Sequence, residues 1–379
     1  MADVLVVAGE ASGDRHGADV VAALRRLRPE VRFFGMGGPS LAAQGVELIH
    51  GSHEISVMGI AEVLPKIPRI LQVLADVARA AAERKPVCAL LIDVPDFNFR
   101  LAKRLKRLGI PVVWFVAPMV WAWRAGRTKK LAKLTDDVLC ILPFEEKFLR
   151  ERGVAATYVG NPVVDQLPSR APAESFRQAL GLDVARPTLA VLPGSRQSEL
   201  ARLLPIMVDV SRRQRAAHPG LQIVVPVAPG ISAEAIRAHF GTDDVTLVSG
   251  RAAEVVGASD VALVASGTAT LEAGLMQRPL VVIYRVSPLT YAVGKALVRL
   301  PFFSLVNLLA QRRVVPELLQ SQVSIDAIVN ELEPLWNGPA REACLAGLEE
   351  VRSTLGAGGA ATRVAEVLAR RIDAATPSS

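Results

Sequence analysis

Nearly continuous apolar runs alternate with helical patterns along the first half of the chain. Apolar strands without a polar face, separated by helices, predict a parallel sheet that is covered by helices on both sides. The runs are VLVVA (4–8), RFFGM (32–36), CALLI (88–92), PVVWFV (111–116), VLCIL (138–142) and TYVG (157–160).

The same pattern starts again in the second half. A Pro-rich stretch at 161–176 reads as a linker between the two halves. We therefore expect an α/β protein with two Rossmann-like domains, at 1–168 and 169–338, whose parallel sheets face a common cleft. The helical tail at 339–379 is expected to pack on the first domain, either of its own chain or of a partner in a homodimer. The second series of runs is TLAVLPG (188–194), QIVVPV (222–227), VTLVS (245–249), VALVAS (261–266) and LVVIYR (280–285).

The stretch GEASGDRHG (9–17) follows the first predicted strand and opens a helix. Backbone N–H groups at a helix N-terminus favour an anion. The loop therefore predicts either a cradle for a nucleotide phosphate or an acceptor pocket, and the residues that face it would be Glu10, Ser12, Gly13 and Asp14.

Two loops of the second half have the same strand–loop–helix setting. Gly194, Ser195 and Arg196 follow one predicted strand, and the Arg196 guanidinium matches a phosphate. The second loop is Ser266-Gly267-Thr268, with Glu272 placed to accept hydrogen bonds from ribose hydroxyls. Turns and helix caps also produce such triplets, but two of them in one domain indicate a nucleotide diphosphate site.

Carboxylates and indoles end two predicted strands of the first half. Asp93 directly follows a buried strand, where a carboxylate can act as a general base. Asp96 and Asn98 come next, and capping of the following helix is the alternative role for Asp96. Trp121 and Arg124 lie after the next strand and are expected to line an apolar site that binds an anion.

An amphipathic segment at 60–78 carries more apolar surface than one buried stripe needs. Most helices of this kind are core elements. The extra apolar area beside Lys66 and Arg69 is also typical of a helix that binds a membrane or an acyl chain. The residues predicted to contact lipid are Val63, Leu64, Ile67, Ile70, Leu71 and Leu74.

Composition narrows the classes of protein. Lys and Arg number 44 against 37 Asp and Glu, and basic runs at 100–107 and 124–133 suit phosphates, nucleic acid or an anionic membrane. A solvated helix face is the alternative. The three cysteines and five histidines show no disulfide framework and no zinc spacing, so no bound metal is expected. Without a signal peptide or a span of ~20 apolar residues, we expect a cytoplasmic protein with only peripheral membrane contact.

Nine stretches of the sequence resemble, in order, blocks of the lipid A disaccharide synthase family (glycosyltransferase family 19). The resemblance covers nearly the whole chain. One departure is Gln311-Arg312, where the family has Gly-Arg. The matching stretches are GEASGD (9–14), VMGIAEVL (57–64), IDVPDFN (92–98), VAPMVWAWR (116–124), LPFEEKF (142–148), VGNPVVD (159–165), LPGSR (192–196), ASGTATLE (265–272) and NLLAQRRVVPELLQ (307–320).

The resemblance implies a GT-B glycosyltransferase without a metal cofactor. It implies transfer of 2,3-diacylglucosamine from its UDP derivative to 2,3-diacylglucosamine 1-phosphate (lipid X), which forms a β(1→6) disaccharide 1-phosphate and UDP at the cytoplasmic face of the inner membrane. It adds Asn307 to the nucleotide site and makes Asp93 the base. The loop at 9–14 then faces the sugar or the donor phosphate.

Three other functions remain open on the sequence. One is a different enzyme of the same architecture, such as a UDP-N-acetylglucosamine 2-epimerase or a peptidoglycan-precursor glycosyltransferase. Another is a module that binds a UDP-sugar or lipid without catalysis. Nucleic-acid binding is the least favoured, because the chain has an apolar stripe and no recognised motif.

Overall fold

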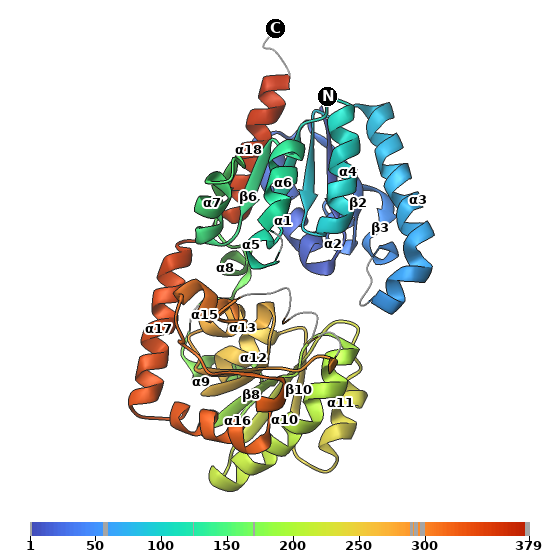
Figure 1. Ribbon diagram of the computed structural model, residues 1–379. Helices are drawn as coiled ribbons and strands as arrows, with labels where there is room; N and C mark the ends of the chain where they lie inside the picture. Colours follow the sequence, from blue (N-terminus) through green and yellow to red (C-terminus); the bar gives the residue numbers. More distant parts are fainter. Residues whose placement is uncertain are drawn as a thin grey trace. The chain divides into compact units, whose positions relative to one another are not determined.

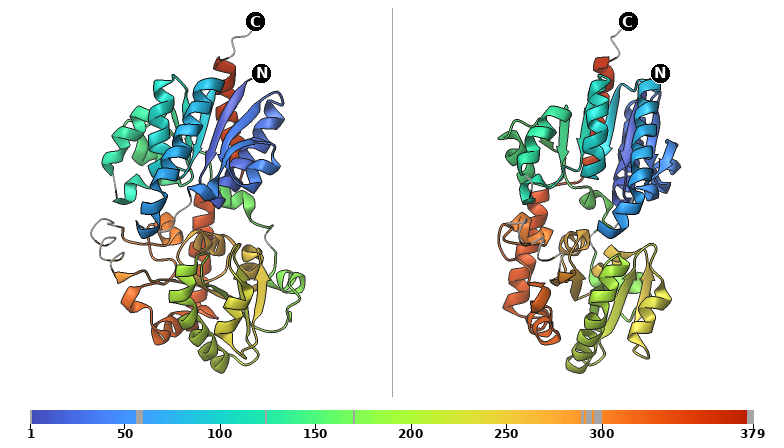
Figure 2. Two further views of the ribbon diagram at one scale, coloured as in Figure 1. Left: turned by 90° about the vertical axis from the view of Figure 1, so that its right-hand side faces the viewer. Right: turned by 45° about the vertical axis from the view of Figure 1, so that its right-hand side comes forward.

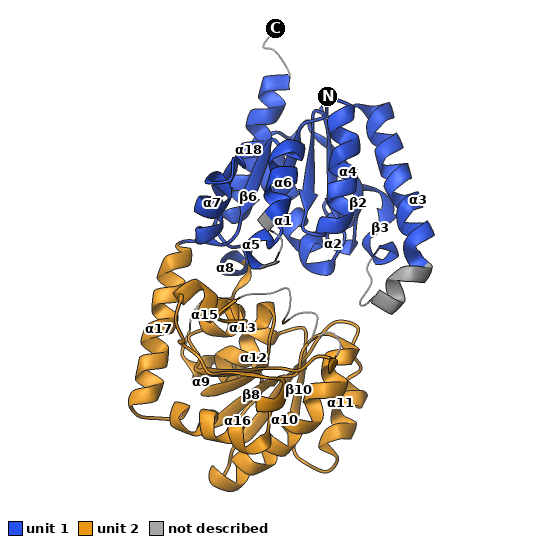
Figure 3. Ribbon diagram, in the orientation of Figure 1, with its two compact units in different colours: residues 1–165, 357–379 blue, residues 166–356 orange. Residues whose placement is uncertain are grey.

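The computed structural model describes residues 2–55, 60–123, 125–169, 171–288, 291, 295 and 300–375, and only the backbone at 60–65, 123 and 125. The chain divides into two compact units (Figure 3). Unit 1 comprises Met1–Asp165 and Ala357–Ser379, and unit 2 comprises Gln166–Gly356. The boundary lies in the predicted linker, three residues before the expected position at 168.

Unit 1 is built on a seven-stranded sheet in which every pair of neighbours is parallel (Figure 1). The strand order is β3-β2-β1-β4-β5-β6-β7. The prediction of a parallel sheet is confirmed, and β3 is a strand that the apolar pattern did not reveal. The strands are β1 (Asp3–Ala8), β2 (Arg32–Gly37), β3 (Glu47–Gly51), β4 (Cys88–Ile92), β5 (Val112–Phe115), β6 (Asp137–Cys140) and β7 (Ala156–Tyr158).

Helices cover both faces of this sheet (Figure 2). Alternate residues of β1 show the reason: Leu5 and Val7 belong to one buried cluster, and Val4 and Val6 belong to the other. Both faces of the strand are therefore buried, which explains the uninterrupted apolar run. The helices are α1 (Ala11–Leu27), α2 (Pro39–Ala43), α3 (Ile60–Arg84), α4 (Pro95–Arg107), α5 (Val120–Trp123), α6 (Thr128–Leu134), α7 (Pro143–Arg150), α8 (Pro162–Gln166) and α18 (Ala360–Ala375).

Unit 2 repeats the plan with a six-stranded parallel sheet of order β10-β9-β8-β11-β12-β13. The short strand β13 was not predicted. Its strands are β8 (Thr188–Leu192), β9 (Gln222–Val227), β10 (Thr246–Ser249), β11 (Val261–Ala265), β12 (Leu280–Tyr284) and β13 (Glu317–Leu319). Its helices are α9 (Ala173–Ala179), α10 (Gln197–Ala217), α11 (Ala233–Phe240), α12 (Ala252–Ala258), α13 (Thr268–Leu275), α15 (Leu305–Ala310), α16 (Ile325–Leu332) and α17 (Pro339–Leu355).

The expected tail at 339–379 does not pack as a whole on the first domain. Helix α17 contacts α13 and α15 and belongs to unit 2, whereas α18 packs along α1 in unit 1 (Figure 1). The physical reason lies in their buried faces. Leu348 of α17 approaches Gly274 of α13, while Val364 and Leu368 of α18 join the cluster formed by α1 and β1. Asp165 fixes the start of α18 by accepting a 2.9 Å hydrogen bond from the Ala360 backbone N–H.

Candidate active site

A strained turn places Asp93 at the carboxyl end of β4. Asp93 and Val94 have φ angles of 50° and 40°, in the left-handed region that a β-branched residue such as valine rarely adopts. The Asp93 backbone N–H donates a 3.1 Å hydrogen bond to the carbonyl oxygen of Phe115 at the end of β5. A side chain at Gly9 would lie 2.7 Å from Val94 Cγ2, so the loop after β1 needs glycine there. Backbone strain of this kind gathers at functional sites.

Asn98 holds this turn from inside α4. Its Nδ2 donates hydrogen bonds to the carbonyl oxygens of Ile92 at 3.2 Å and Asp93 at 2.7 Å. The side chain is 0% exposed. The prediction that Asn98 contacts sugar is therefore wrong, because a fully buried amide cannot reach a substrate. It positions Asp93 instead.

The surroundings of the Asp93 carboxyl raise its pKa. Burial first, and then the nearby Glu10 carboxylate, raise its pKa to about 6, while the Val94 N–H opposes the rise. A carboxylate with this pKa is mostly ionised at pH 7 and is a stronger base than an exposed aspartate. The structure thus brings together Asp93 and Glu10, two carboxylates from separate sequence motifs.

The loop at 9–14 contributes fewer site residues than predicted. Glu10 precedes the first turn of α1 and is exposed, and Ser12 in that turn is half-buried. Gly13 is buried, and a Cβ there would lie 3.4 Å from Ile92 Cγ2, so its role is the packing of α1 on β4. Glu10 and Ser12 are the residues of the predicted set that remain available to a ligand.

Asp14 is wrongly predicted as a sugar or phosphate contact. Its carboxylate is buried and accepts three backbone hydrogen bonds at the start of α2, from Gly38 at 2.6 Å, Ser40 at 2.8 Å and Leu41 at 3.1 Å. Both oxygens are therefore used to cap a neighbouring helix. Because Asp14 is only 3% exposed and its two oxygens bind the backbone of α2, it is not available to a substrate.

The sequence pattern did not single out His16 of α1. Its ring lies edge-on to Phe115, with 6.3 Å between the centroids. Burial first, and then the Arg15 charge, lower its pKa to about 4, so the imidazole is neutral at pH 7. The only signal in the sequence was its place one turn after Gly13 on the same helix.

The indole of Trp121 binds the carboxyl of Glu145, a residue that the sequence analysis did not predict as part of the site. Its Nε1 donates a 2.9 Å hydrogen bond to Glu145 Oε1, and its ring lies edge-on to Phe144 at 4.9 Å. Glu145 is 1% exposed, and burial raises its pKa to about 7. Its other oxygen accepts the Leu142 N–H at the start of α7. The stretch LPFEEKF carried this residue, but its two adjacent glutamates look alike in sequence.

Two predicted acceptor residues of this region, Asp96 and Arg124, remain to be placed. Asp96 is exposed and pairs with Arg127 at 2.9 Å. It does not cap α4 through a side-chain hydrogen bond. Arg124 lies outside the described residues.

In unit 2, Glu199 occupies the first predicted phosphate loop. Its Oε2 accepts hydrogen bonds from the backbone N–H groups of Ser195 at 3.1 Å and Arg196 at 3.3 Å, and its Oε1 lies 3.4 Å from Arg196 Nη1. Gly194 has a φ of 104°, and a Cβ there would clash with the Glu199 carboxylate. The backbone N–H groups of Ser195 and Arg196, two residues of the predicted nucleotide site, are therefore already used by a capping carboxylate. Exposed N–H groups of the Arg196 guanidinium still face solvent.

The second predicted loop keeps its helix start uncapped. Gly267 precedes α13 with a φ of 154°, and this N-cap residue makes no side-chain cap hydrogen bond because glycine has no side chain. Ser266 is half-buried and Thr268 is exposed. Glu272 lies in the next turn, half-buried. This helix N-terminus can therefore receive an anion.

Asn307 is wrongly predicted as a nucleotide contact. It is 0% exposed, and its Nδ2 donates to the Val315 carbonyl at 2.9 Å and to Glu317 Oε1 at 2.8 Å. Its Oδ1 accepts the backbone N–H groups of Val314 at 2.7 Å and Val315 at 3.0 Å. The side chain is fully used in fixing the segment that leads into β13.

Helix α3 divides the residues predicted to contact lipid. Ile67 and Leu71 are 38% and 41% exposed, and Ile70 is half-buried against the core. Leu74 is 2% exposed inside that core, so its prediction as a lipid contact is wrong. The side chains of Val63 and Leu64 lie outside the described residues.

The described ranges contain neither a candidate membrane span nor a cluster of metal-binding side chains. Within them, no helix combines the length and the apolar character that crossing a bilayer requires. In that same part of the chain, no three His, Cys, Asp or Glu side chains are grouped so that they could hold a metal ion. The cysteines Cys88, Cys140 and Cys344 are buried and unbridged.

Solved structures with the same architecture span the whole chain. A UDP-GlcNAc 2-epimerase from Neisseria meningitidis, bound to UDP-GlcNAc, aligns with a TM-score of 0.65 at 14% identity and covers 97% of this chain and 100% of its own. The calicheamicin glycosyltransferase CalG4 aligns with a TM-score of 0.64 at 13% identity over 100% of both chains. At these identities the likeness shows the fold alone.

Sequence relatives are much closer. The lipid-A-disaccharide synthase of Myxococcus xanthus (strain DK1622) is 61% identical over 366 residues, and that of Anaeromyxobacter sp. (strain K) is 55% identical over 367 residues. Each alignment covers 96% of both chains. Residues 4–348 match the lipid-A-disaccharide synthetase family. The chain therefore belongs to the lipid-A-disaccharide synthetase family, and it is a glycosyltransferase with two Rossmann-like α/β units.

Proposed function

We propose that this chain transfers 2,3-diacylglucosamine from UDP-2,3-diacylglucosamine to 2,3-diacylglucosamine 1-phosphate (lipid X). The products are a β(1→6)-linked disaccharide 1-phosphate and UDP. Membership of the family and the names of the relatives support this reaction. The observation that carries the proposal within the structure is the Asp93 carboxyl, half-buried at a strand end with a pKa of about 6.

The chemical step is a single inverting displacement. Asp93 takes the proton from the 6-hydroxyl of the acceptor while that oxygen forms a bond to the anomeric carbon of the donor. The bond between that carbon and the diphosphate oxygen breaks, and its electron pair leaves with UDP. The Glu10 carboxylate raises the pKa of Asp93 and so strengthens the base. Asn98 keeps the Asp93 backbone in its strained position.

The leaving group is held by unit 2. The exposed guanidinium of Arg196 and the uncapped start of α13, at Ser266, Gly267 and Thr268, bind the diphosphate, and Glu272 accepts from the ribose. These cationic and dipolar groups balance the charge that grows on UDP. We propose that no metal cofactor takes part, as the family resemblance implies.

The proposed substrates carry acyl chains, so the enzyme must reach a membrane. Exposed Ile67 and Leu71 on α3 insert into the interface, and neighbouring basic residues such as Lys66 attract anionic headgroups. We propose peripheral attachment to the cytoplasmic face of the inner membrane.

Mass spectrometry of a reaction with both purified substrates tests the function. We expect a disaccharide 1-phosphate whose mass equals the acceptor plus one diacylglucosaminyl residue, together with UDP. Omission of the acceptor should abolish both products. Conversion of the donor without a disaccharide would contradict the proposal, and an altered free UDP-sugar would indicate an epimerase instead.

A further inference from the structure

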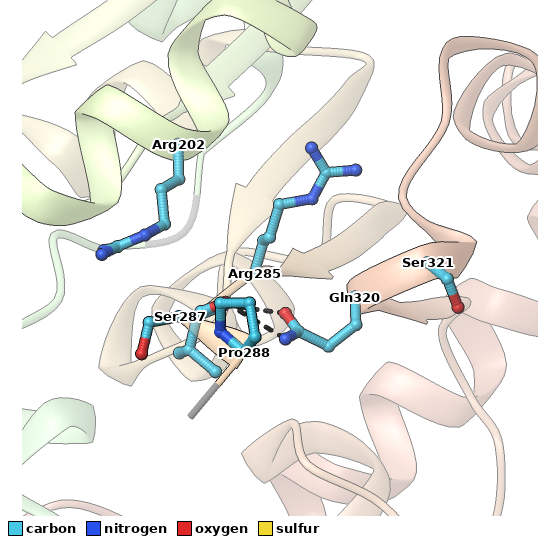
Figure 4. A pocket seen from close by; sticks show the side chains of 7 residues that line it. Arg202, Arg285, Ser287, Pro288, Gln320 and Ser321 are labelled. Carbon is cyan, nitrogen blue, oxygen red and sulfur yellow. Dashed lines mark hydrogen bonds between the residues drawn. The ribbon is translucent and has the colours of Figure 1, made fainter. Parts of the chain in front are cut away.

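Unit 2 contains a cavity of about 490 Å³ that none of the predicted site residues lines (Figure 4). Arg202 of α10 contributes one wall, residues 285–288 after β12 another, and Gln320 with Ser321 after β13 a third. The cavity thus lies beyond the carboxyl ends of parallel strands, where ligands of such sheets bind. Its volume falls in the usual range of small-molecule sites.

Specific hydrogen bonds build the floor of the cavity. Gln320 Oε1 accepts the Val286 N–H at 2.8 Å, and Gln320 Nε2 donates to the Val286 carbonyl at 3.1 Å (Figure 4). One side-chain amide therefore joins the two segments that leave β12 and β13. Gln320 itself has a φ of 53°, a left-handed conformation that is costly for a residue with a side chain. The Gln320 amide thus fixes the two lining segments to each other at Val286.

Both arginines of the cavity lack a carboxylate partner among the described residues. Arg202 Nη1 donates to the Ser198 carbonyl at 2.9 Å, and Arg285 Nη2 donates to the Val323 carbonyl at 2.5 Å. Each guanidinium has five N–H donors, so most of them remain for a ligand.

Some other arginines of unit 2 are neutralised by a carboxylate. Arg177 pairs with Asp260 at 2.6 Å, and Arg212 pairs with Asp243 at 2.7 Å. Arg202 and Arg285 therefore bring two guanidinium groups, each without a carboxylate partner in the described part of the chain, to one cavity. Uncompensated guanidinium groups favour an anionic ligand, and their planar fork fits phosphate.

Tyr284 connects this cavity to the predicted nucleotide loop. Burial and the Glu199 carboxylate raise the pKa of its hydroxyl, while Arg196 and Arg202 act in the opposite direction. The hydroxyl therefore feels the charges of Arg196, from the nucleotide loop, and of Arg202, from the cavity. The two arginines belong to neighbouring parts of one surface.

We propose that Arg202 and Arg285 form a second anion site in unit 2, which binds a phosphate group of an acylated sugar substrate. The identity of the ligand rests on the proposed function, in which the donor carries a diphosphate and the acceptor a monophosphate. In Figure 4 the two guanidinium groups lie apart and come from different elements. The exposed, flexible stem of Arg202 allows it to turn toward an anion held by Arg285.

Calorimetric titrations of the full-length chain test this site. The variants are Arg202→Gln and Arg285→Gln, and the matched control is Arg213→Gln, an exposed arginine on the same helix, α10. Each protein is titrated with UDP, with 2,3-diacylglucosamine 1-phosphate and with 2,3-diacylglucosamine that lacks the phosphate. Thermal melting of each variant checks the fold.

The two phosphate sources give different results. If the site holds the acceptor phosphate, both variants should bind the acceptor roughly tenfold or more weakly, with UDP affinity unchanged. If it holds the donor diphosphate, UDP affinity should fall by a similar factor instead. In either case the acceptor without phosphate should bind all variants equally.

Three results would overturn the proposal. One is a folded Arg202→Gln variant in which neither UDP nor acceptor affinity changes. Another is an equal loss for the acceptor without phosphate, which would mean that the contact is not with phosphate. The third is an equal loss in Arg213→Gln, which would indicate general electrostatics. Arg202 is exposed, so its variant decides the matter even if Arg285→Gln fails to fold.

Failure of this site and failure of the proposed function are distinguishable. The binding titrations need no turnover. If the unaltered enzyme forms no disaccharide from both substrates, the proposed function fails, whatever the titrations show. If it forms the disaccharide and all variants bind both ligands normally, only the second anion site fails.

Discussion

The side-chain amide of Asn98 donates a 2.7 Å hydrogen bond to the backbone carbonyl of Asp93. A second bond from the same amide reaches the carbonyl of Ile92 at 3.2 Å. Asn98 is fully buried, so water cannot easily replace its amide as the donor to these two carbonyl groups. The position of the proposed base therefore depends on a residue that touches no substrate.

Replacement of Asn98 with Ala should destabilise the protein and slow the reaction together. Two buried carbonyl groups lose their donor, which costs about 1–3 kcal/mol of the free energy of unfolding. We expect the turnover number to fall more than the UDP affinity, because the base shifts while unit 2 is unchanged. Urea unfolding and steady-state kinetics measure both effects. An Asn98→Ala variant with wild-type stability and turnover would rule out this positioning role.

Gln311 offers a stabilising substitution. It ends α15 with a φ of 53°, the left-handed position that glycine usually takes after a helix. The side chain is exposed, so little packing is lost on its removal. Gln311→Gly should raise the free energy of unfolding by about 1 kcal/mol, as measured by urea unfolding. A lower stability would show that the side chain contributes more than the backbone strain costs.

The apolar pattern predicted both sheets because their central strands are buried on both faces. It missed β3, whose residues are half-buried or exposed, and β13, which has only three residues. Polar residues were harder to assign. Asp93, Asp14 and Asn307 all lie near strand ends or helix starts, yet only the structure shows that Asp14 and Asn307 spend every acceptor on backbone N–H groups. The role of Glu199 was not predicted, because it binds backbone N–H groups, and every residue except proline has one.

Membrane attachment through α3 can be separated from folding. Ile67 and Leu71 are 38% and 41% exposed, so serine at both positions should leave thermal stability nearly unchanged. Sedimentation with anionic liposomes should show weaker binding, and salt should weaken the binding of the unaltered protein. Val184→Ser, at an apolar residue of unit 2 with 41% exposure, is the matched control. Equal loss in that control would argue against a specific role of α3.

The guanidinium of Arg196 is expected to carry much of the UDP affinity. The loop amides are engaged by Glu199, so the side chain is the group of that loop best placed to reach the diphosphate. Arg196→Ala should weaken UDP binding by about 1.5–3 kcal/mol, the usual worth of a hydrogen bond to a charged group. Glu272→Ala should weaken it as well, through the ribose. Unchanged calorimetric affinity in both variants would contradict this assignment.

Asp93 should also destabilise the fold at neutral pH. Its pKa is 3.8 in the unfolded chain and about 6 in the folded protein, so its contribution to stability is greatest below pH 3.8 and is lost as the pH rises through about 6. Asp93→Asn removes a charge that folding disfavours. Its stability relative to the unaltered protein should therefore increase between pH 5 and pH 8, by on the order of 1 kcal/mol. Urea unfolding at both pH values measures the difference, and a pH-independent difference would refute the raised pKa.

The turnover number of Asp93→Asn tests the central claim most directly. The substitution preserves the shape of the side chain and removes its basicity, so turnover should fall by roughly 10²–10⁴, while UDP affinity stays unchanged. In the unaltered enzyme, activity should decline as the pH falls below about 6, where the Asp93 carboxylate becomes protonated. A folded Asp93→Asn enzyme that keeps more than about a tenth of the wild-type turnover would show that Asp93 is not the general base.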